Sequence, residues 1–462
     1  MTSVPRPPAA VTAAAPAVAS VAGAAAAAGA DRADDGRLRA PGTLMDAPIP
    51  GVEETVLANG LRIVTETMPE ARSVSLGAWV RVGGRDEPDE LAGASHFLEH
   101  LLFKGTESRG AREIAEAVDA VGGEMNAFTA REHTAYYTRL PHAELGLGVE
   151  ILGDILTAPA LRPSEVEAER QVIVEEILMN LDAPDDRVHT LLAEALFPGH
   201  PLGRDVLGER ATVEAIGRSD LVGFFERWYR PRTIVVAAAG RLDHSALVEA
   251  VAAALGSRAG GERPPRAAPG PLESAVVVEP DDTEQAHLCL GWRALPVDHD
   301  DRWALAVANQ VLGGGTASRL FQEVREARGL AYAVYSHAGG YSDSGYLSIY
   351  LGTAPERARQ ALAVVDGVIA DLVADGVSER ERDVAVGYLE GSLLLGLEDS
   401  GSRMARLAVS LVQRDEVISV DESVARLRAV TPADVHRVLQ TVLGGPRALA
   451  AVGPFTDRDL LR

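Results

Sequence analysis

The chain has 462 residues, and its 67 Asp and Glu side chains outnumber 44 Lys and Arg, which gives a formal net charge of −23. This balance excludes a general nucleic-acid binder, because neutralising phosphates requires a basic face. A hydrophobic share of 47% and a charged share of 24% are typical of a globular protein with ample material for a core. One cysteine, Cys289, excludes an intramolecular disulfide framework. The only lysine, Lys104, lies outside any Gly-Lys-Ser/Thr loop, which excludes a P-loop.

The first 44 residues differ from the rest in composition. They are rich in Ala and Pro and show no polar periodicity, so we interpret them as a disordered tail. A weak secretory signal is the alternative, and a start at Met45 is a third interpretation. No run of 18 strongly apolar residues follows, so we expect no membrane span and a cytoplasmic protein.

From residue 52 the pattern predicts strands and helices in alternation. An Asn59-Gly60 turn joins two strands, as in a hairpin. The following elements are a strand at 74–82, helices at 91–105 and 110–121, a strand pair at 124–139, a helical hairpin at 142–197 and a strand at 233–239. Residues 256–272 are rich in Gly, Pro and Arg and are interpreted as a linker.

After the linker the same order begins again. Strands are expected at 275–278 and 285–292, helices at 303–312 and 319–328, a strand pair at 332–335 and 346–351, and helices at 356–375 and 378–397. The words Glu169-Arg170-x-Val172 and Glu381-Arg382-x-Val384 also match between the halves. We therefore predict an α+β protein with two homologous halves, 45–255 and 273–462, each a mostly antiparallel sheet covered by helices.

The segment His96-Phe-Leu-Glu99-His100 carries the strongest chemical signal. On a helix, the two histidines lie one turn apart on one face, a spacing that suits zinc. Glu99 beside them can take a proton from water without binding the metal. A structurally satisfied polar cluster is the alternative, and a catalytic zinc site would need a third ligand from elsewhere in the chain.

A second segment, Glu167 to Ile177, supports the metal interpretation. Together with the motif at 96–100, it resembles the pitrilysin-type zinc metallopeptidases, and in particular their mitochondrial-processing-peptidase-like branch. The resemblance runs from about residue 50 to 455 and includes Phe-Lys-Gly-Thr after the motif, Met125 to Thr129, Pro201 to Arg204, and Trp228 to Pro231.

The resemblance implies one zinc ion per chain and a set of site residues. The implied roles are His96, His100 and Glu176 as zinc ligands, Glu99 as the general base, and Glu169 as a supporting acid. Glu175 is the rival of Glu176 as third ligand, and only one of these neighbours can face the metal, since adjacent helix positions point about 100° apart. The second half lacks these ligands, because Tyr388 replaces Glu176 in the aligned words.

The resemblance also implies residues that bind substrate. Arg325 and Tyr332 match an element of the second half that reaches the substrate, where Arg holds a carbonyl and Tyr stabilises an oxyanion. The alternative is a helix end at Gly329 with Tyr332 packed in the core. Asn126 and Ala127 match an edge strand that pairs with the substrate backbone.

These features predict a zinc-dependent endopeptidase that hydrolyses extended peptides or presequence-like segments, with Glu99 activating the metal-bound water. Its acidic body would attract basic peptides. The resemblance implies a homodimer or a heterodimer with a related subunit, the two halves closing as a clamshell hinged at 256–272. A non-catalytic partner subunit and a dedicated peptide-maturation protease are the alternatives.

Overall fold

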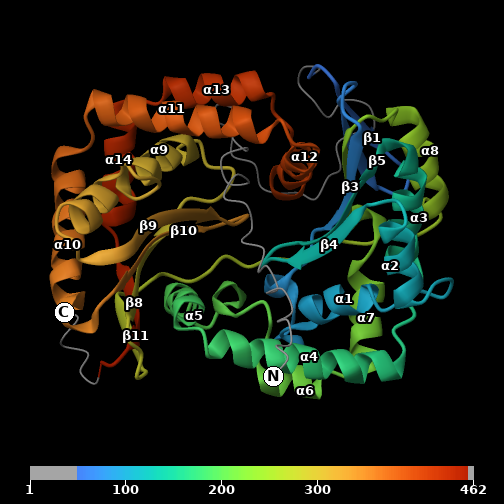
Figure 1. Cartoon of the computed structure of the whole chain (residues 1–462), viewed down its shortest axis with the longest axis horizontal. Coiled ribbons are helices and arrows are strands. Elements are labelled where there is room, and N and C mark those ends of the chain that lie inside the picture. Colours follow the sequence, from blue (N-terminus) through green and yellow to red (C-terminus); the bar gives the residue numbers. More distant parts are fainter. Residues whose placement is uncertain (1–48, 456–462) are drawn as a thin grey trace, which may run out of the picture.

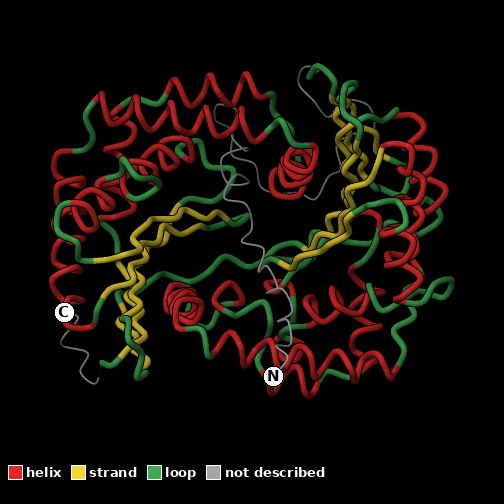
Figure 2. The backbone as a smooth tube through the Cα atoms, viewed as in Figure 1, coloured by secondary structure: helices red, strands yellow, loops and turns green. Residues whose placement is uncertain are grey.

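The computed structural model describes residues 49–455, so the predicted tail at 1–44 lies outside the described residues. The chain folds into two β-sheets, each covered by helices, that face one another across the molecule (Figures 1 and 2). The predicted α+β class with two homologous halves is confirmed. Among residues 49–455, no helix combines the length and the apolar character that crossing a membrane requires.

The first half contains a six-stranded sheet and eight α-helices within the described chain. The strands are β1 (Val52–Val56), β2 (Arg62–Thr67), β3 (Ser73–Val80), β4 (Glu124–Thr129), β5 (Thr134–Pro141) and β6 (Ile234–Gly240). The helices are α1 (Ala94–Leu102), α2 (Ala111–Asp119), α3 (Leu145–Thr157), α4 (Pro163–Leu181), α5 (Pro184–Leu196), α6 (Arg210–Ala215), α7 (Arg218–Trp228) and α8 (His244–Leu255).

The second half contains a five-stranded sheet and six α-helices within the same described range. The strands are β7 (Ala275–Pro280), β8 (Ala286–Ala294), β9 (Ala331–Gly340), β10 (Gly345–Thr353) and β11 (Arg447–Gly453). The helices are α9 (Arg302–Leu312), α10 (Ala358–Asp375), α11 (Glu379–Gly396), α12 (Ser400–Arg414), α13 (Val420–Ala429) and α14 (Pro432–Leu443). The helix predicted at 319–328 is instead a π-helical turn at Phe321–Glu326.

The two sheets share one topology. Their orders are β1-β2-β6-β3-β5-β4 and β7-β11-β8-β10-β9, so that β2 corresponds to β7 and β6 to β11. β2 pairs with β6, and β7 pairs with β11, in the parallel sense. The remaining strand pairs within the two sheets are antiparallel. The central β6 is apolar and buried along its whole length, as expected for a strand covered on both faces. The duplicated order of elements predicted from the sequence is therefore present in three dimensions.

One helix of each half packs on the sheet of the other half. α12 buries Met404, Leu407 and Leu411 against the first sheet, where they join a core with Trp79 and Val235. α5 does the reverse, and its apolar face packs on β8 and β11 of the second sheet. The helical hairpin predicted at 142–197 is consequently wrong in its last third, because α5 leaves α3 and α4 to cover the opposite half.

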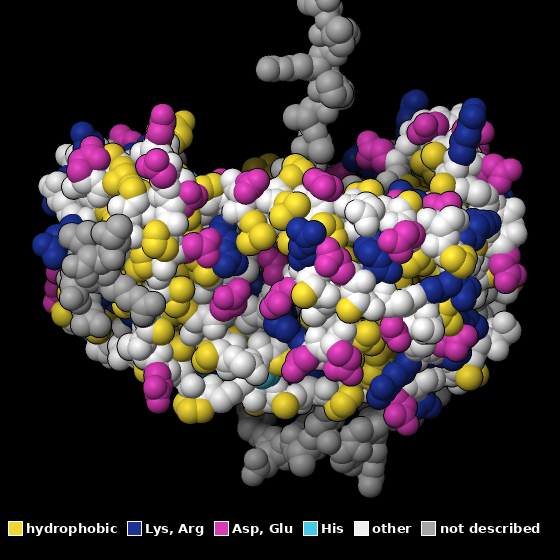
Figure 3. All heavy atoms as spheres, turned by 90° about the horizontal axis from the view of Figure 1, so that it is seen from below, with side chains coloured by type: hydrophobic (Ala, Val, Ile, Leu, Met, Phe, Trp, Pro, Cys, Tyr) yellow, Lys and Arg dark blue, Asp and Glu magenta, His cyan; other side chains and the backbone are white. Residues whose placement is uncertain are grey.

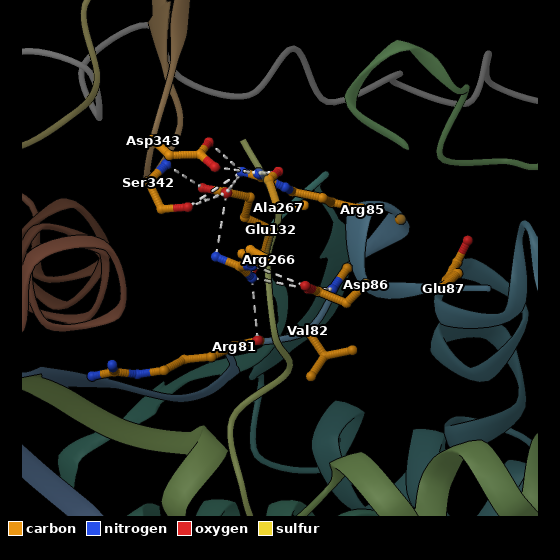
Figure 4. A network of polar contacts seen from close by, with 12 residues as sticks. Arg81, Val82, Arg85, Asp86, Glu87, Glu132, Arg266, Ala267, Ser342 and Asp343 are labelled. Carbon is orange, nitrogen blue, oxygen red and sulfur yellow. Dashed lines mark hydrogen bonds and ion pairs between the residues drawn. The ribbon is translucent and has the colours of Figure 1, made fainter. Parts of the chain in front are cut away.

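A polar network ties the halves and the linker together (Figure 4). Arg85 of the first half forms a salt bridge with Glu132 of the same half and another with Asp343 of the second half, at 2.6 Å each. From the linker, Arg266 binds Asp86 at 2.8 Å. Arg263, also in the linker, binds Asp415 just after α12 at 2.7 Å. Rotation at 256–272 would have to break these contacts and separate α5 and α12 from the sheets that they cover; the hinge stays a prediction.

The face seen in Figure 3 carries acidic and basic side chains interspersed with one another. Within that view no large area is of one sign. Long-range attraction of basic peptides would therefore depend on the net charge of the chain rather than on an acidic patch of this face.

Candidate metal centre

The helix α1 is held by a carboxylate at its amino end. Glu87 is buried and accepts hydrogen bonds from the backbone N–H groups of Gly93, at 2.8 Å, and Ser95, at 2.6 Å. A carboxyl oxygen at a helix amino terminus satisfies backbone N–H groups that have no partner within the helix. Gly93 has φ +98°, and a Cβ there would lie 2.7 Å from the carbonyl oxygen of Leu207. These contacts orient the helix that carries the histidines.

The helix α4 packs against α1 and supplies the acids. Buried Ile173 and Ile177 anchor it in the core. Arg170 lies over the Phe97 ring of α1, 5.4 Å from its centroid, and donates a hydrogen bond to the Val213 carbonyl. With this register, Glu169 and Glu176, seven residues apart, both face α1.

The structure brings His96, His100 and Glu176 together. Oε2 of Glu176 lies 3.6 Å from Nε2 of His96 and 3.5 Å from Nε2 of His100. The ligand atoms of all three lie within 4.8 Å of one another. Bonds of about 2.0–2.1 Å around a tetrahedral zinc ion separate ligand atoms by roughly 3.3 Å, so this donor set fits zinc. Glu175, the rival third ligand, is outside the cluster found among the described residues.

The protonation preferences of His96 and Glu176 also suit a cation, whereas that of His100 reflects its two acidic neighbours. Burial, with a smaller contribution from the charge of His100, lowers the pKa of His96 to about 4, which keeps its imidazole neutral. Burial also acts to lower the pKa of His100, but its hydrogen bonds to Glu176 and Glu169 outweigh that effect and raise the pKa. The hydrogen bond from His100 lowers the pKa of Glu176, so this carboxyl is ionised. The site thus offers two imidazoles and a carboxylate, the ligand types that catalytic zinc uses.

Glu99, the predicted general base, lies next to the triad without belonging to it. Thr129 of β4 donates a hydrogen bond to Oε2 of Glu99 at 2.6 Å. Burial raises the pKa of Glu99 from its ordinary value, against the opposing effect of this hydrogen bond. A carboxylate with a raised pKa is a stronger base, which is the property that proton transfer from water requires.

Glu169, the predicted supporting acid, contacts a histidine rather than the metal position. Its Oε2 lies 3.1 Å from Nδ1 of His100, and its Oε1 lies 2.8 Å from Nζ of Lys104. No role for Lys104 or Thr129 was predicted from the sequence. A signal for Lys104 was present, since it is the only lysine and lies four residues after His100. For Thr129 there was no comparable signal.

Asn126 and Ala127 lie in β4, at the end of the six-stranded sheet. β4 pairs with β5 on one side, where Asn126 lies opposite Tyr137. The sheet order leaves its other side without a strand partner among the described residues. β4 also contacts α1, so this edge runs beside the histidine helix.

Arg325 and Tyr332 contact each other but lie in the second half. The guanidinium of Arg325 lies 5.0 Å from the centroid of the Tyr332 ring. Tyr332 is 80% exposed, so its alternative interpretation as a core aromatic is wrong. The turn that carries Arg325 packs on β9 and α10, and Figure 1 places α10 on the opposite side of the molecule from α1. The structure therefore does not bring this pair to the triad within one chain.

The chain belongs to the peptidase M16 family. A family model described as "Insulinase (Peptidase family M16)" matches residues 62–210, and one described as "Peptidase M16 inactive domain" matches residues 215–388. Together they cover both halves, and the resemblance to pitrilysin-type zinc metallopeptidases is confirmed. The range matched by the first model includes the histidine helix and Glu176, and the range matched by the second includes Arg325 and Tyr332.

Relatives with similar sequences carry the name "uncharacterized zinc protease". One from Streptomyces coelicolor is 44% identical over 89% of this chain and 91% of its own length. One from Mycobacterium tuberculosis is 44% identical over 88% and 94%, and one from Bacillus subtilis is 37% identical over 86% and 97%. These names agree with a metallopeptidase that uses zinc.

Two solved structures share the fold at low sequence identity. A protease from Helicobacter pylori superposes with a TM-score of 0.82 at 21% identity, covering 88% of this chain and 100% of that one. A peptidase M16 inactive domain from Pseudomonas fluorescens has a TM-score of 0.82 at 20% identity, covering 88% and 98%. Both support the arrangement of two sheets covered by helices.

Proposed function

We propose that this protein is a zinc-dependent endopeptidase that cleaves extended peptides and holds one zinc ion per chain. The observation that carries the proposal is the convergence of His96, His100 and Glu176 from two helices at distances that suit tetrahedral zinc. The base Glu99 stands beside them, as hydrolysis of a peptide bond requires.

The roles of the chain's own residues follow from the geometry. Bound zinc would polarise the scissile carbonyl and lower the pKa of water. The carboxylate of Glu99 takes the proton from the attacking water and later delivers it to the leaving amine. Thr129 orients the Glu99 carboxylate, since its hydroxyl donates a hydrogen bond to Oε2 of Glu99 and leaves Oε1 free to accept from water.

Substrate would add to the free edge of β4. A strand that extends a sheet binds through its backbone, so β4 favours extended and unstructured peptides. Asn126 is exposed in this strand, and the neighbouring Thr129 contacts Glu99. A peptide paired along this edge is thereby delivered beside the base.

We further propose that a second subunit completes the site. Arg325 and Tyr332 form an exposed pair on the half that lacks the triad. If they bind substrate, as the family resemblance implies, they do so in the active site of a second copy or a related chain. Mixing an inactive Glu99→Gln chain with an inactive Tyr332→Phe chain tests this arrangement, because mixed dimers would contain one intact site.

The alternative of a non-catalytic partner subunit finds less support, since all of the ligand positions of the first half are occupied by ligand-type residues. Broad peptide degradation and maturation of one dedicated precursor would use the same geometry. A cytoplasmic location also stays a prediction.

The decisive experiment is cleavage of quenched fluorescent peptides by the full-length protein. We expect activity that a chelator abolishes, that zinc restores, and that Glu99→Gln removes while zinc content is retained. Activity that survives both the chelator and Glu99→Gln would refute the proposed mechanism. A protein that binds zinc but cleaves no peptide in a broad library, alone or with a related subunit, would support the partner-subunit alternative.

A further inference from the structure

The chain's only lysine is bonded to the acid that supports a proposed zinc ligand. Nζ of Lys104 lies 2.8 Å from Oε1 of Glu169. The second oxygen of the same carboxylate lies 3.1 Å from Nδ1 of His100. These two contacts form a line from the ammonium group through the carboxylate to the imidazole.

The line ends at the metal-facing nitrogen of His100. An ionised carboxylate can only accept hydrogen bonds, so Nδ1 of His100 carries the hydrogen and Nε2 keeps its lone pair. That Nε2 lies 3.5 Å from Oε2 of Glu176. Glu169 therefore selects the tautomer and the ring orientation that a metal at Nε2 requires.

His96 has no such support. Its Nδ1 is buried and has no hydrogen-bond partner among the described residues. The orientation of His96 thus depends on packing alone, whereas that of His100 depends on Glu169. Any group that holds Glu169 in place also holds one of the two imidazoles.

Glu169 needs a second partner because it is only 5% exposed. A buried carboxylate is costly unless both of its oxygens are paired. Lys104 supplies the pairing for Oε1, and the side chain of Lys104 is 35% exposed. The ammonium also offsets negative charge where three acids, Glu99, Glu169 and Glu176, approach one site.

The backbone places Lys104 for this contact. α1 ends at Leu102, and the N–H of Lys104 still donates to the Leu101 carbonyl at 3.0 Å, which continues the turn. Lys104 therefore lies one turn beyond His100 on the same face. Gly105 follows with φ +113°, where a Cβ would lie 2.8 Å from the Arg109 carbonyl oxygen. The chain leaves the helix directly after the lysine.

We propose that Lys104 is a positioning residue for the zinc ligand His100, acting through Glu169. The inference rests on the proposed zinc site and adds to it a residue that touches neither metal nor substrate. Removal of the ammonium frees one oxygen of Glu169, and the carboxylate then no longer holds the imidazole in one orientation.

The second half offers a matched control. Glu381 occupies the position of Glu169 in the aligned words, and it is paired with Arg319 at 2.6 Å. Arg319→Met also removes the ionic partner of a glutamate, here one whose side chain is 32% exposed, at a place outside the candidate metal centre. A general effect of losing such an ion pair would appear in both variants.

The experiment measures zinc affinity by competition with a chromophoric chelator, using full-length protein. We expect Lys104→Met to weaken zinc binding by about 10–100-fold, the usual effect of losing an outer partner of a metal ligand. Arg319→Met should leave the zinc affinity unchanged. Lys104→Arg, which keeps a cation beside Glu169, should bind zinc more tightly than Lys104→Met but less tightly than wild type. The visible absorption of the Co²⁺-loaded protein should change in Lys104→Met. The metal-free protein should unfold at a lower temperature than wild type, because Oε1 of the buried Glu169 loses its partner.

Two further arms keep the test decisive. In a Glu169→Gln background, Lys104→Met should add little, because the lysine acts through that acid. Lys104 and the amino terminus are the only amines that an acetylating reagent can modify in the wild type. Acetylation of the folded protein should therefore weaken zinc binding by the wild type but not by Lys104→Arg. If Lys104→Met bound zinc as tightly as wild type, the inference about Lys104 would be overturned and the proposed function would stand. Absence of zinc binding by the wild type would instead overturn the proposed function.

Discussion

The helices α4 and α11 occupy the same place in the two halves, and they differ at the positions that matter for a metal. Each carries an arginine that bonds to a backbone carbonyl of a later segment: Arg170 to Val213 and Arg382 to Val430. The acid one residue earlier has diverged in use. Glu169 contacts His100 and Lys104, whereas Glu381 caps its own helix through Ser378 and pairs with Arg319.

About two turns further along each helix, the difference becomes chemical. Glu176 of α4 contacts two histidines of α1, whereas its counterpart Tyr388 of α11 is 53% exposed. The helix α9, which corresponds to α1, contains no histidine. The duplicated framework kept the packing arginine in both halves and the cluster of two histidines and a glutamate in one. Packing and chemistry therefore depend on different residues of the same helix.

The largest effect is expected from the third ligand. Glu176→Ala should remove zinc and lower peptide cleavage by at least about 10³-fold, since three protein ligands are needed to hold a catalytic zinc ion. Metal analysis and a fluorescent-peptide assay measure both effects. The neighbouring Glu175→Ala should keep zinc. Loss of zinc from Glu175→Ala with retention in Glu176→Ala would reverse the assignment.

Glu99→Gln should separate binding from chemistry. The amide cannot accept the proton from water, so kcat should fall by about 10²–10⁴-fold. Zinc content should equal that of wild type, because Glu99 is not among the clustered ligand atoms. Thr129→Val should give a smaller loss, through the hydrogen bond that orients the base. Equal kcat for Glu99→Gln and wild type would remove the base from the mechanism.

The substrate-binding pair tests whether the second half contributes. Tyr332→Phe removes one hydrogen-bond donor and should lower kcat by about 10²-fold, a typical cost of losing an oxyanion donor. Zinc affinity should not change, because Tyr332 is not among the clustered ligand atoms. If single-variant chains stay inactive when a Glu99→Gln chain and a Tyr332→Phe chain are mixed and re-equilibrated, the pair does not act across subunits.

The smallest effect concerns acid stability of the second half. Hydrogen bonding to Arg319 lowers the pKa of Glu381 to about 2, below its ordinary 4.5. A lowered folded-state pKa gives stability that is present above the unfolded value and is lost as the pH falls from about 4.5 toward 2. Arg319→Met should flatten this part of the pH dependence in chemical denaturation. An unchanged acid limb would show that the pair contributes nothing measurable to stability.

The sequence by itself determined the local chemistry. His96, Glu99 and His100 share one helix, so the helical period alone places both imidazoles on one face with the base beside them. The strands and most helices were also predictable, because alternation and apolar runs are local signals. The duplication was visible in the repeated order of elements and in the words around Glu169 and Glu381.

The distant ligand required more than spacing. Glu176 lies 76 residues beyond His100, and only the family resemblance pointed to it rather than to Glu175. The packing of α4 on α1 supports Glu176, because it brings Glu176 and not Glu175 into the cluster with the histidines.

Only the tertiary structure showed which sheet each helix covers. The apolar faces of α5 and α12 indicate that both are buried, but burial is non-directional and does not say against which half. The same holds for Lys104 and Thr129, whose roles arise from contacts with Glu169 and Glu99 across the fold. Periodicity acts along one segment, whereas these contacts join segments that only the packed core brings together.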